Sequence, residues 1–116
     1  MKKTVSGTFA VGSSETAVIQ LNELYTLTGI TITGSVITGS LVTILGSVDG
    51  TNFYSAYNSS STELSLTVTS ASRTYAVDPN AFLPYDFIKA RLGTSGSAKL
   101  QATYNAGVLF HLKTIE

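Results

Sequence analysis

The chain contains no cysteine and no tryptophan among its 116 residues. The missing cysteine excludes disulfide bonds, thiolate zinc sites and cysteine nucleophiles. Charge is also scarce, because seven Lys and Arg balance seven Asp and Glu, and charged residues make up only 12% of the chain. A weakly charged, neutral protein has no broad field that attracts a polyanion, so nucleic acid is not expected as a partner.

Long apolar runs are missing as well. Residues 1–4 have the basic start of a signal peptide, but no apolar segment of adequate length follows them, so we expect no secretory signal. No apolar run approaches the roughly 18 residues that a membrane-spanning helix needs. We therefore expect a protein that is soluble when assembled and has no membrane partner.

Short alternating segments, rich in β-branched residues, make up most of the chain. Ser and Thr occupy 32 of the 116 positions, and no helical period is sustained. The clearest alternation places Leu64, Leu66 and Val68 on one face. The prediction is an all-β fold, an antiparallel β-sandwich or jelly roll, with residues 1–116 as a single domain and residues 1–7 as a flexible N-terminal arm.

Three segments near the N-terminus carry more specific signals. Residues 4–11 and 17–21 alternate on either side of a Gly-Ser-Ser turn, which predicts a hairpin. Residues 25–32 change phase at Gly29, which predicts a β-bulge or a strand break.

Three further segments have interpretable patterns. Residues 40–49 are apolar on both faces, which predicts a central strand or one covered by another subunit. In residues 78–84, Asp78 can cap a helical turn that Pro79 begins and Pro84 ends after about one turn. Residues 93–96 read as a hairpin loop.

The stretch "ILGSVDGTNFYSAY" allows two interpretations of its acidic residue. Asp49 and Asn52 offer oxygen ligands, but calcium takes six to eight ligands and no second acidic cluster lies nearby. Asp49-Gly50 between two apolar segments is also a strong hairpin signal, because Gly tolerates positive φ and Asp accepts bonds from the local backbone. We favour a turn and expect no metal.

The aromatic residues of the same stretch also allow two interpretations. Phe53, Tyr54 and Tyr57 are candidates for a platform on which a sugar ring stacks. In a regular strand, however, Phe53 and Tyr57 point to one face and Tyr54 to the other. Burial in the core and packing at a sheet edge are therefore the favoured interpretation.

Residues that could carry catalysis are few. The only histidine is His111, and no serine lies in a nucleophile-elbow context. A facing pair of carboxylates is not expected, since most of the acidic residues fall at predicted turns or termini. Lys89 and Arg91 predict a basic stripe on one strand face, with solvent or Asp86 as its partner. The seven acidic residues are Glu15, Glu23, Asp49, Glu63, Asp78, Asp86 and Glu116.

Three stretches resemble a group of small tailed-phage virion proteins of β-sandwich type. They are "LTGITI", "LVTILGSVDGTNFYSAYN" and "SASRTYAVDPNAFLPYDFIKARLGTSGSAKLQA", and they span roughly residues 24–102. The matching positions are Gly29, Ile30, Ser47, Asp49, Gly50, Phe53, Tyr75, Ile88, Lys89, Arg91, Gly93, Thr94 and Gln101. The resemblance implies a capsid-decorating, cement or fibre-associated role without catalysis, and it transfers no active-site residue.

The resulting functional expectation is a non-enzymatic phage structural protein. The first hypothesis is a capsid decoration or cement protein that is made in the host cytoplasm and binds the lattice of the major capsid protein on the particle surface. A homo-oligomer is expected, with a trimer favoured. The alternative is a carbohydrate-binding module of a phage tail or fibre, and only that alternative has carbohydrate as a partner. Neither hypothesis requires a cofactor, a metal or a catalytic residue.

Overall fold

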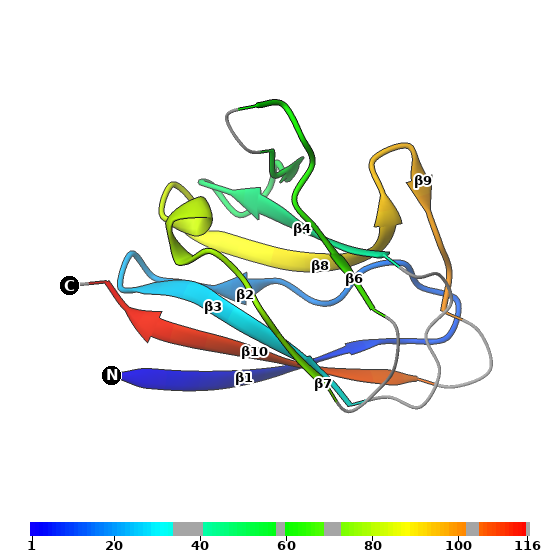
Figure 1. Ribbon diagram of the computed structural model, residues 1–116, viewed down its shortest axis with the longest axis horizontal. Helices are drawn as coiled ribbons and strands as arrows, with labels where there is room; N and C mark the ends of the chain where they lie inside the picture. The colour runs from blue at the N-terminus through cyan, green and yellow to red at the C-terminus, as the bar shows by residue number, and fades with distance from the viewer. Residues whose placement is uncertain (34–40, 58–59, 69–72, 102–104, 116) are drawn as a thin grey trace.

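The computed structural model describes residues 1–33, 41–57, 60–68, 73–101 and 105–115. Two antiparallel sheets lie face to face and enclose one apolar core, so the predicted all-β sandwich is confirmed (Figure 1). The two sheets form the upper and lower layers of the view in Figure 1.

Each sheet combines strands that are distant in the sequence. The first sheet has the strand order β1-β10-β3-β7, and the second has the order β2-β8-β4-β5, with β6 also paired to β4 and β9 to β8. In the first sheet the strands are Lys2–Phe9 (β1), Tyr25–Ile32 (β3), Arg73–Ala76 (β7) and Ala106–Thr114 (β10). In the second they are Ile19–Gln20 (β2), Leu41–Ser47 (β4), Tyr54–Ser55 (β5), Ser65–Thr67 (β6), Phe87–Thr94 (β8) and Ser97–Ala98 (β9).

The core lies between the inner faces of the two sheets. Alternation decides which side chains enter it, since Ile88, Ala90 and Leu92 of β8 are buried while Lys89 and Arg91 point to the other face. The core cluster consists of Phe9, Ile19, Leu21, Leu27, Ile30, Ile32, Val42, Ile44, Phe82, Ile88, Ala90, Leu92, Ala106, Val108, Phe110 and Leu112.

The N-terminal segment differs from the free arm expected from the sequence. Lys2–Phe9 forms an edge strand that pairs with β10 over its whole length, from Lys2 opposite Lys113 to Phe9 opposite Ala106. The physical reason is the alternation of this segment, which turns Phe9 and Val5 toward the core. Residues 2–7 are therefore part of the sheet.

The predicted hairpin between the first two strands is wrong. The chain leaves β1 through a turn at Gly12, whose φ is +83°, and crosses to the second sheet. There it runs beside β8, where the Thr16 amide donates to Ala90 O (3.0 Å) and the Leu92 amide donates to Ser14 O (2.8 Å). These backbone groups pair with β8, which is a long strand of the second sheet. β1 and β2 therefore lie in different sheets.

Two other strand predictions are confirmed. The register of β3 against β10 shifts between His111 and Leu112, opposite Gly29 and Leu27, which is the bulge predicted from the change of phase. β4 lies centrally, with β8 on one side and β5 and β6 on the other, as its two apolar faces predicted.

The predicted helical turn is also confirmed, as the 3-10 helix Pro79–Phe82 (η1). The Asp78 carboxylate accepts from the Asn80 amide (3.0 Å), and Phe82 of the turn is buried in the core. The hairpin predicted at residues 93–96 joins β8 to β9, but Gly93 and Thr94 still pair with Ala98 and Ser97, so the loop itself is residues 95–96. No helix in the described ranges is long and apolar enough to cross a membrane.

Candidate functional site

The turn between β4 and β5 is organised by two short side chains. Asp49 Oδ1 accepts from the amides of Thr51 and Asn52, both at 2.9 Å, and from Ser47 Oγ (2.9 Å). Asp49 Oδ2 accepts from Asn52 Nδ2 (3.0 Å). Ser47 Oγ in turn accepts from the amides of Asp49 (3.2 Å) and Gly50 (2.9 Å), and Gly50 has the positive φ of +78° that the sequence predicted.

These bonds determine what the Asp49 carboxylate can do. The backbone amides of Asn52 and Thr51, followed by the Ser47 and Asn52 side chains, lower the pKa of Asp49 well below its ordinary value. Both carboxylate oxygens are used inside the turn, and no group of three or more potential metal-ligating side chains occurs in the described part of the chain. The turn interpretation is confirmed, and the role of Asp49 is to hold the turn.

The aromatic residues after this turn do not share one environment. Phe53 is half-buried, and Lys89 Nζ lies 4.5 Å from its ring centroid, in the range of a cation–π contact. Tyr54 and Tyr57 are 68% and 52% exposed. The favoured interpretation combined burial in the core with packing at a sheet edge. Burial in the core is not found for the two tyrosines. Tyr54 does lie at a sheet edge, in the two-residue strand β5.

The basic stripe on β8 has acidic partners that the sequence did not indicate. Arg91 Nη2 lies 2.6 Å from Glu63 Oε2 and 3.1 Å from Ser55 Oγ, while its Nε donates to Thr43 Oγ1 (3.0 Å). Lys89 Nζ lies 2.7 Å from Glu15 Oε1. The expected pair with Asp86 is not the arrangement found.

This polar cluster holds the β5–β6 connection against the outer face of the second sheet. The side chains of Arg91 and Glu63 are only 11% and 15% exposed, and Glu63 also accepts from the Ser95 amide (3.2 Å). The partners come from positions 28 and 74 residues away in the chain, so no local pattern predicts them. Arg91 thereby links β8 to Thr43 of β4, Ser55 of β5 and Glu63.

His111 lies in a row of hydroxyl groups on the outer face of the first sheet. Its Nε2 is 2.6 Å from Thr31 Oγ1, its Nδ1 is 3.4 Å from Thr4 Oγ1, and Thr31 Oγ1 is 2.6 Å from Thr74 Oγ1. The row crosses all four strands of the sheet. Its neighbours are threonines, and the described residues bring no carboxylate within ion-pair distance of the imidazole, so a Ser-His-Asp arrangement is not assembled there.

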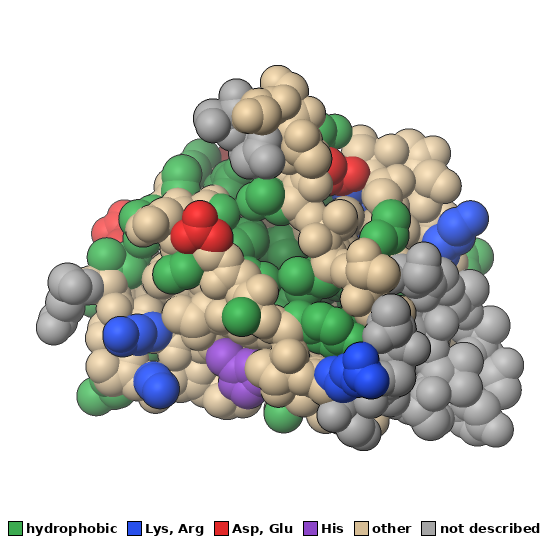
Figure 2. Space-filling model, viewed as in Figure 1, with side chains coloured by type: hydrophobic (Ala, Val, Ile, Leu, Met, Phe, Trp, Pro, Cys, Tyr) green, Lys and Arg blue, Asp and Glu red, His purple; other side chains and the backbone are tan. Residues whose placement is uncertain are grey.

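An apolar groove opens between β6 and β7, at one long edge of the sandwich. The two strands are edge strands of different sheets, and no ladder among the described residues joins them. Figure 2 shows hydrophobic side chains gathered in a hollow between the two layers in this region. The groove has a volume of about 210 Å³. Its lining residues are Ile44, Leu64, Ser65, Leu66, Ala76, Val77, Asp78, Ala81 and Phe82.

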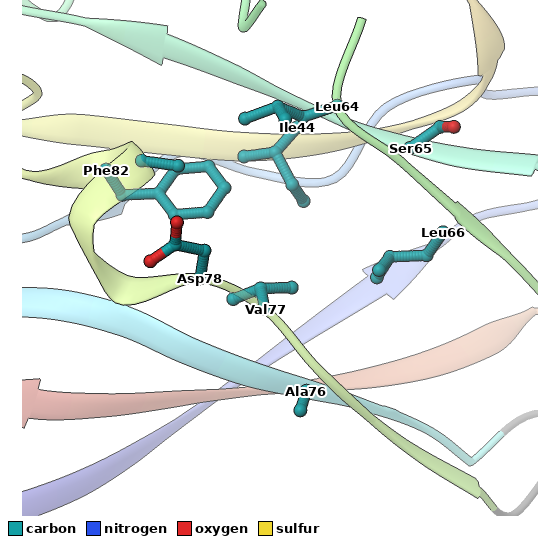
Figure 3. A pocket seen from close by; sticks show the side chains of 9 residues that line it. Ile44, Leu64, Ser65, Leu66, Ala76, Val77, Asp78 and Phe82 are labelled. Carbon is teal, nitrogen blue, oxygen red and sulfur yellow. The ribbon is translucent and has the colours of Figure 1, made fainter. Parts of the chain in front are cut away.

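The close view in Figure 3 shows how the groove is built. Leu66 and Val77 come from the two sides, Ile44 and Phe82 lie deeper, and the Asp78 carboxyl group is directed toward Phe82. Ile44 and Phe82 are each only 2% exposed, so the groove reaches the core. The sequence marked Leu64, Leu66 and Asp78 as strand and cap residues, but nothing in it indicated that they meet.

Comparisons with known proteins support the fold. No protein-family model matches the chain, and no curated protein matches it. Among solved structures, the chain is similar to the SPBc2 prophage-derived protein YomS, with a TM-score of 0.55 and 14% sequence identity. That match covers 97% of this chain and 94% of that chain. At this level of identity the likeness shows a shared all-β fold.

Proposed function

We propose that the chain is a non-enzymatic structural protein of a phage particle, and specifically a decoration or cement protein that binds the assembled head. The carrying observation is the fold shared with a prophage-derived protein over nearly the full length of both chains. The sequence resemblance to small virion β-sandwich proteins points the same way. Asp49, Arg91 and His111 bond to neighbours in turns and strands of the fold, which suits a protein that acts by contact.

In this role many copies of the chain bind the lattice of the major capsid protein at the particle surface, after synthesis in the host cytoplasm. The protein acts as a homo-oligomer, most readily as a trimer. Binding to the assembled lattice and not to its dissociated subunits stabilises the shell by mass action. Large exposed apolar side chains supply contact surface; they include Val18, Leu24, Val48, Leu83 and Leu100.

The test is reconstitution with mature shells made without this protein. Purified chain is mixed with the shells and sedimented, and both the bound copy number and the temperature of shell rupture are measured. Saturable binding with a raised rupture temperature is expected. Binding to tails with none to shells would contradict the head assignment. Sedimentation equilibrium of the free protein then measures the oligomeric state.

A second candidate is a carbohydrate-binding module of a tail or fibre. The observation that favours it is the exposure of Tyr54 and Tyr57, whose rings are available to stack on sugar. Titration with host surface polysaccharide, followed by intrinsic tyrosine fluorescence, tests this candidate. Saturable binding that disappears in Tyr54→Ala and Tyr57→Ala, while both variants remain folded, would favour it over decoration.

A further inference from the structure

The groove between β6 and β7 has a free strand edge along one side. The Val77 amide donates to Thr28 O (3.1 Å), in register with the pairs that join β7 to β3. Because the paired residues of an antiparallel ladder alternate, the backbone groups of Thr74 and Ala76 point away from β3, toward the open side. The structure gives these groups no backbone partner among the described residues.

The shape of the groove restricts its occupant. Pockets for small molecules have volumes of about 300–1,000 Å³, and this groove is smaller, at about 210 Å³. It is lined mainly by apolar side chains from both sheets, with Ile44 and Phe82 of the core at its inner end. One large apolar side chain next to a free strand edge is the occupant that fits both features, and an extended segment of protein supplies both.

Asp78 adds a charge preference to this site. It lines the groove, and its Oδ1 accepts from the Asn80 amide, while Oδ2 has no partner among the described residues. Asp78 is an exposed residue, so its carboxylate is available to a cation from outside. A Lys or Arg two positions from the apolar side chain lies on the same face of an extended segment and complements this carboxylate.

We propose that the groove binds an extended segment of a partner protein, which adds a strand to the free edge of β7. The segment inserts a large apolar side chain between β6 and β7 and places a Lys or Arg at Asp78. The inference goes beyond the proposed function, because it concerns how a partner chain is held and not which part of a phage particle supplies that chain.

The test uses the whole protein and a synthetic peptide, acetyl-Thr-Val-Thr-Phe-Thr-Lys-Thr-amide, whose Phe and Lys lie on one face. Binding is followed by the amide chemical shifts of the ¹⁵N-labelled protein. Shifts concentrated at Leu66, Thr74, Ala76 and Val77 are expected. A peptide with Ser in place of Phe is expected to bind at least about tenfold more weakly, since it leaves the groove empty.

Two protein variants separate the apolar and the charged contributions. Ala81→Phe fills the groove and is expected to weaken binding at least about tenfold, while Ala98→Phe on exposed β9 serves as the matched control and leaves binding unchanged. Asp78→Asn keeps an acceptor for the cap. This variant is expected to bind the Lys-containing peptide about threefold or more weakly than the unmutated protein does. Its binding of a peptide with Gln in place of Lys should be unchanged.

Three outcomes would overturn the proposal. The first is the absence of shifts at the groove residues up to the solubility limit of the peptide. The second is equal binding by the Phe and Ser peptides, which would indicate adhesion without insertion. The third is self-association of the unmutated protein that shifts the same amides and is abolished by Ala81→Phe, because the occupant would then be a second copy of this chain. Since no shell or tail is used, these results are independent of the reconstitution that tests the proposed function.

Discussion

At the scale of single residues, Gly46 shows why a small side chain is needed in a central strand. It faces the ring of Tyr85, and a Cβ at this position would lie 2.5 Å from the ring carbons. We expect Gly46→Ala to lower the free energy of unfolding by about 1–3 kcal/mol, the usual cost of overpacking. Urea denaturation measures this cost. Adding Tyr85→Leu should recover part of it, and strict additivity of the two substitutions would contradict a steric cause.

Asp49 gives a prediction about pH. Its pKa is lowered by the fold, so the charged form stabilises the native state above the pKa of the unfolded chain, and this stabilisation is lost as the pH falls toward the lower folded value. The melting temperature of Asp49→Ala should therefore lie below that of the unmutated protein at neutral pH. The difference should narrow as the pH falls below about 4. A difference in melting temperature that stays constant from pH 7 to pH 2 would show that the charge of Asp49 does not contribute to stability.

Arg91 and Lys89 allow a comparison of two ion pairs on one strand. The Arg91–Glu63 pair is the more buried, with side chains 11% and 15% exposed, while those of Lys89 and Glu15 are 19% and 39% exposed. Arg91→Met leaves the largely buried Glu63 carboxylate without its cation, and we expect it to lower the free energy of unfolding by about 3 kcal/mol. Lys89→Met is the control and should cost about 1 kcal/mol or less.

The double variant Arg91→Met with Glu63→Leu provides the second half of that test. Removing both charges avoids an unpaired group, so the double variant should be more stable than Arg91→Met alone. Chemical denaturation of the unmutated protein, Arg91→Met, Lys89→Met and the double variant measures the free energies of unfolding. A double variant that is less stable than Arg91→Met would mean that the hydrogen bonds donated by the Ser95 amide to the Glu63 carboxylate dominate the cluster.

At the scale of elements, β1 carries the clearest consequence of pairing. A free arm at residues 1–7 could be deleted without loss of stability, but these residues include most of a strand that pairs with β10. Deletion of residues 1–7 should therefore lower the melting temperature clearly. It should also remove protection from hydrogen exchange at the amides of Ala106–Thr114 that point toward β1, while the amides that pair with β3 keep theirs. Unchanged melting and exchange would restore the arm interpretation.

At the scale of the whole molecule, both sheets contribute to one core cluster. Neither sheet can keep its inner face buried without the other, so we expect one cooperative unfolding transition. Scanning calorimetry should give a calorimetric enthalpy equal to the van't Hoff enthalpy. It should also give a heat-capacity change of about 1.5 kcal/mol/K for a domain of this length. Two resolved transitions would contradict a single domain.

The sequence by itself determined the features that depend on near neighbours. Alternation predicted the strands and the half-buried row of Leu64, Leu66 and Val68, and the change of phase at Gly29 predicted the bulge in β3. Asp78 with Pro79 predicted the helical turn, and Asp49 with Gly50 predicted the turn after β4. In each case the backbone conformation and its hydrogen bonds lie within a few residues, so the local residue types are sufficient.

Only the tertiary structure decided which segments meet. Four features depend on contacts or sheet edges that are distant in the chain. They are the pairing of β1 with β10, the ion pair of Arg91 with Glu63, the exposure of Tyr54 and Tyr57, and the groove between β6 and β7. An alternating pattern states that one face of a strand is buried but not which strand lies beside it, because any apolar inner face satisfies the same requirement. The partners were selected by the packing of the whole core. The candidate binding groove arises because β6 and β7 are edge strands of different sheets that no ladder within the described residues joins.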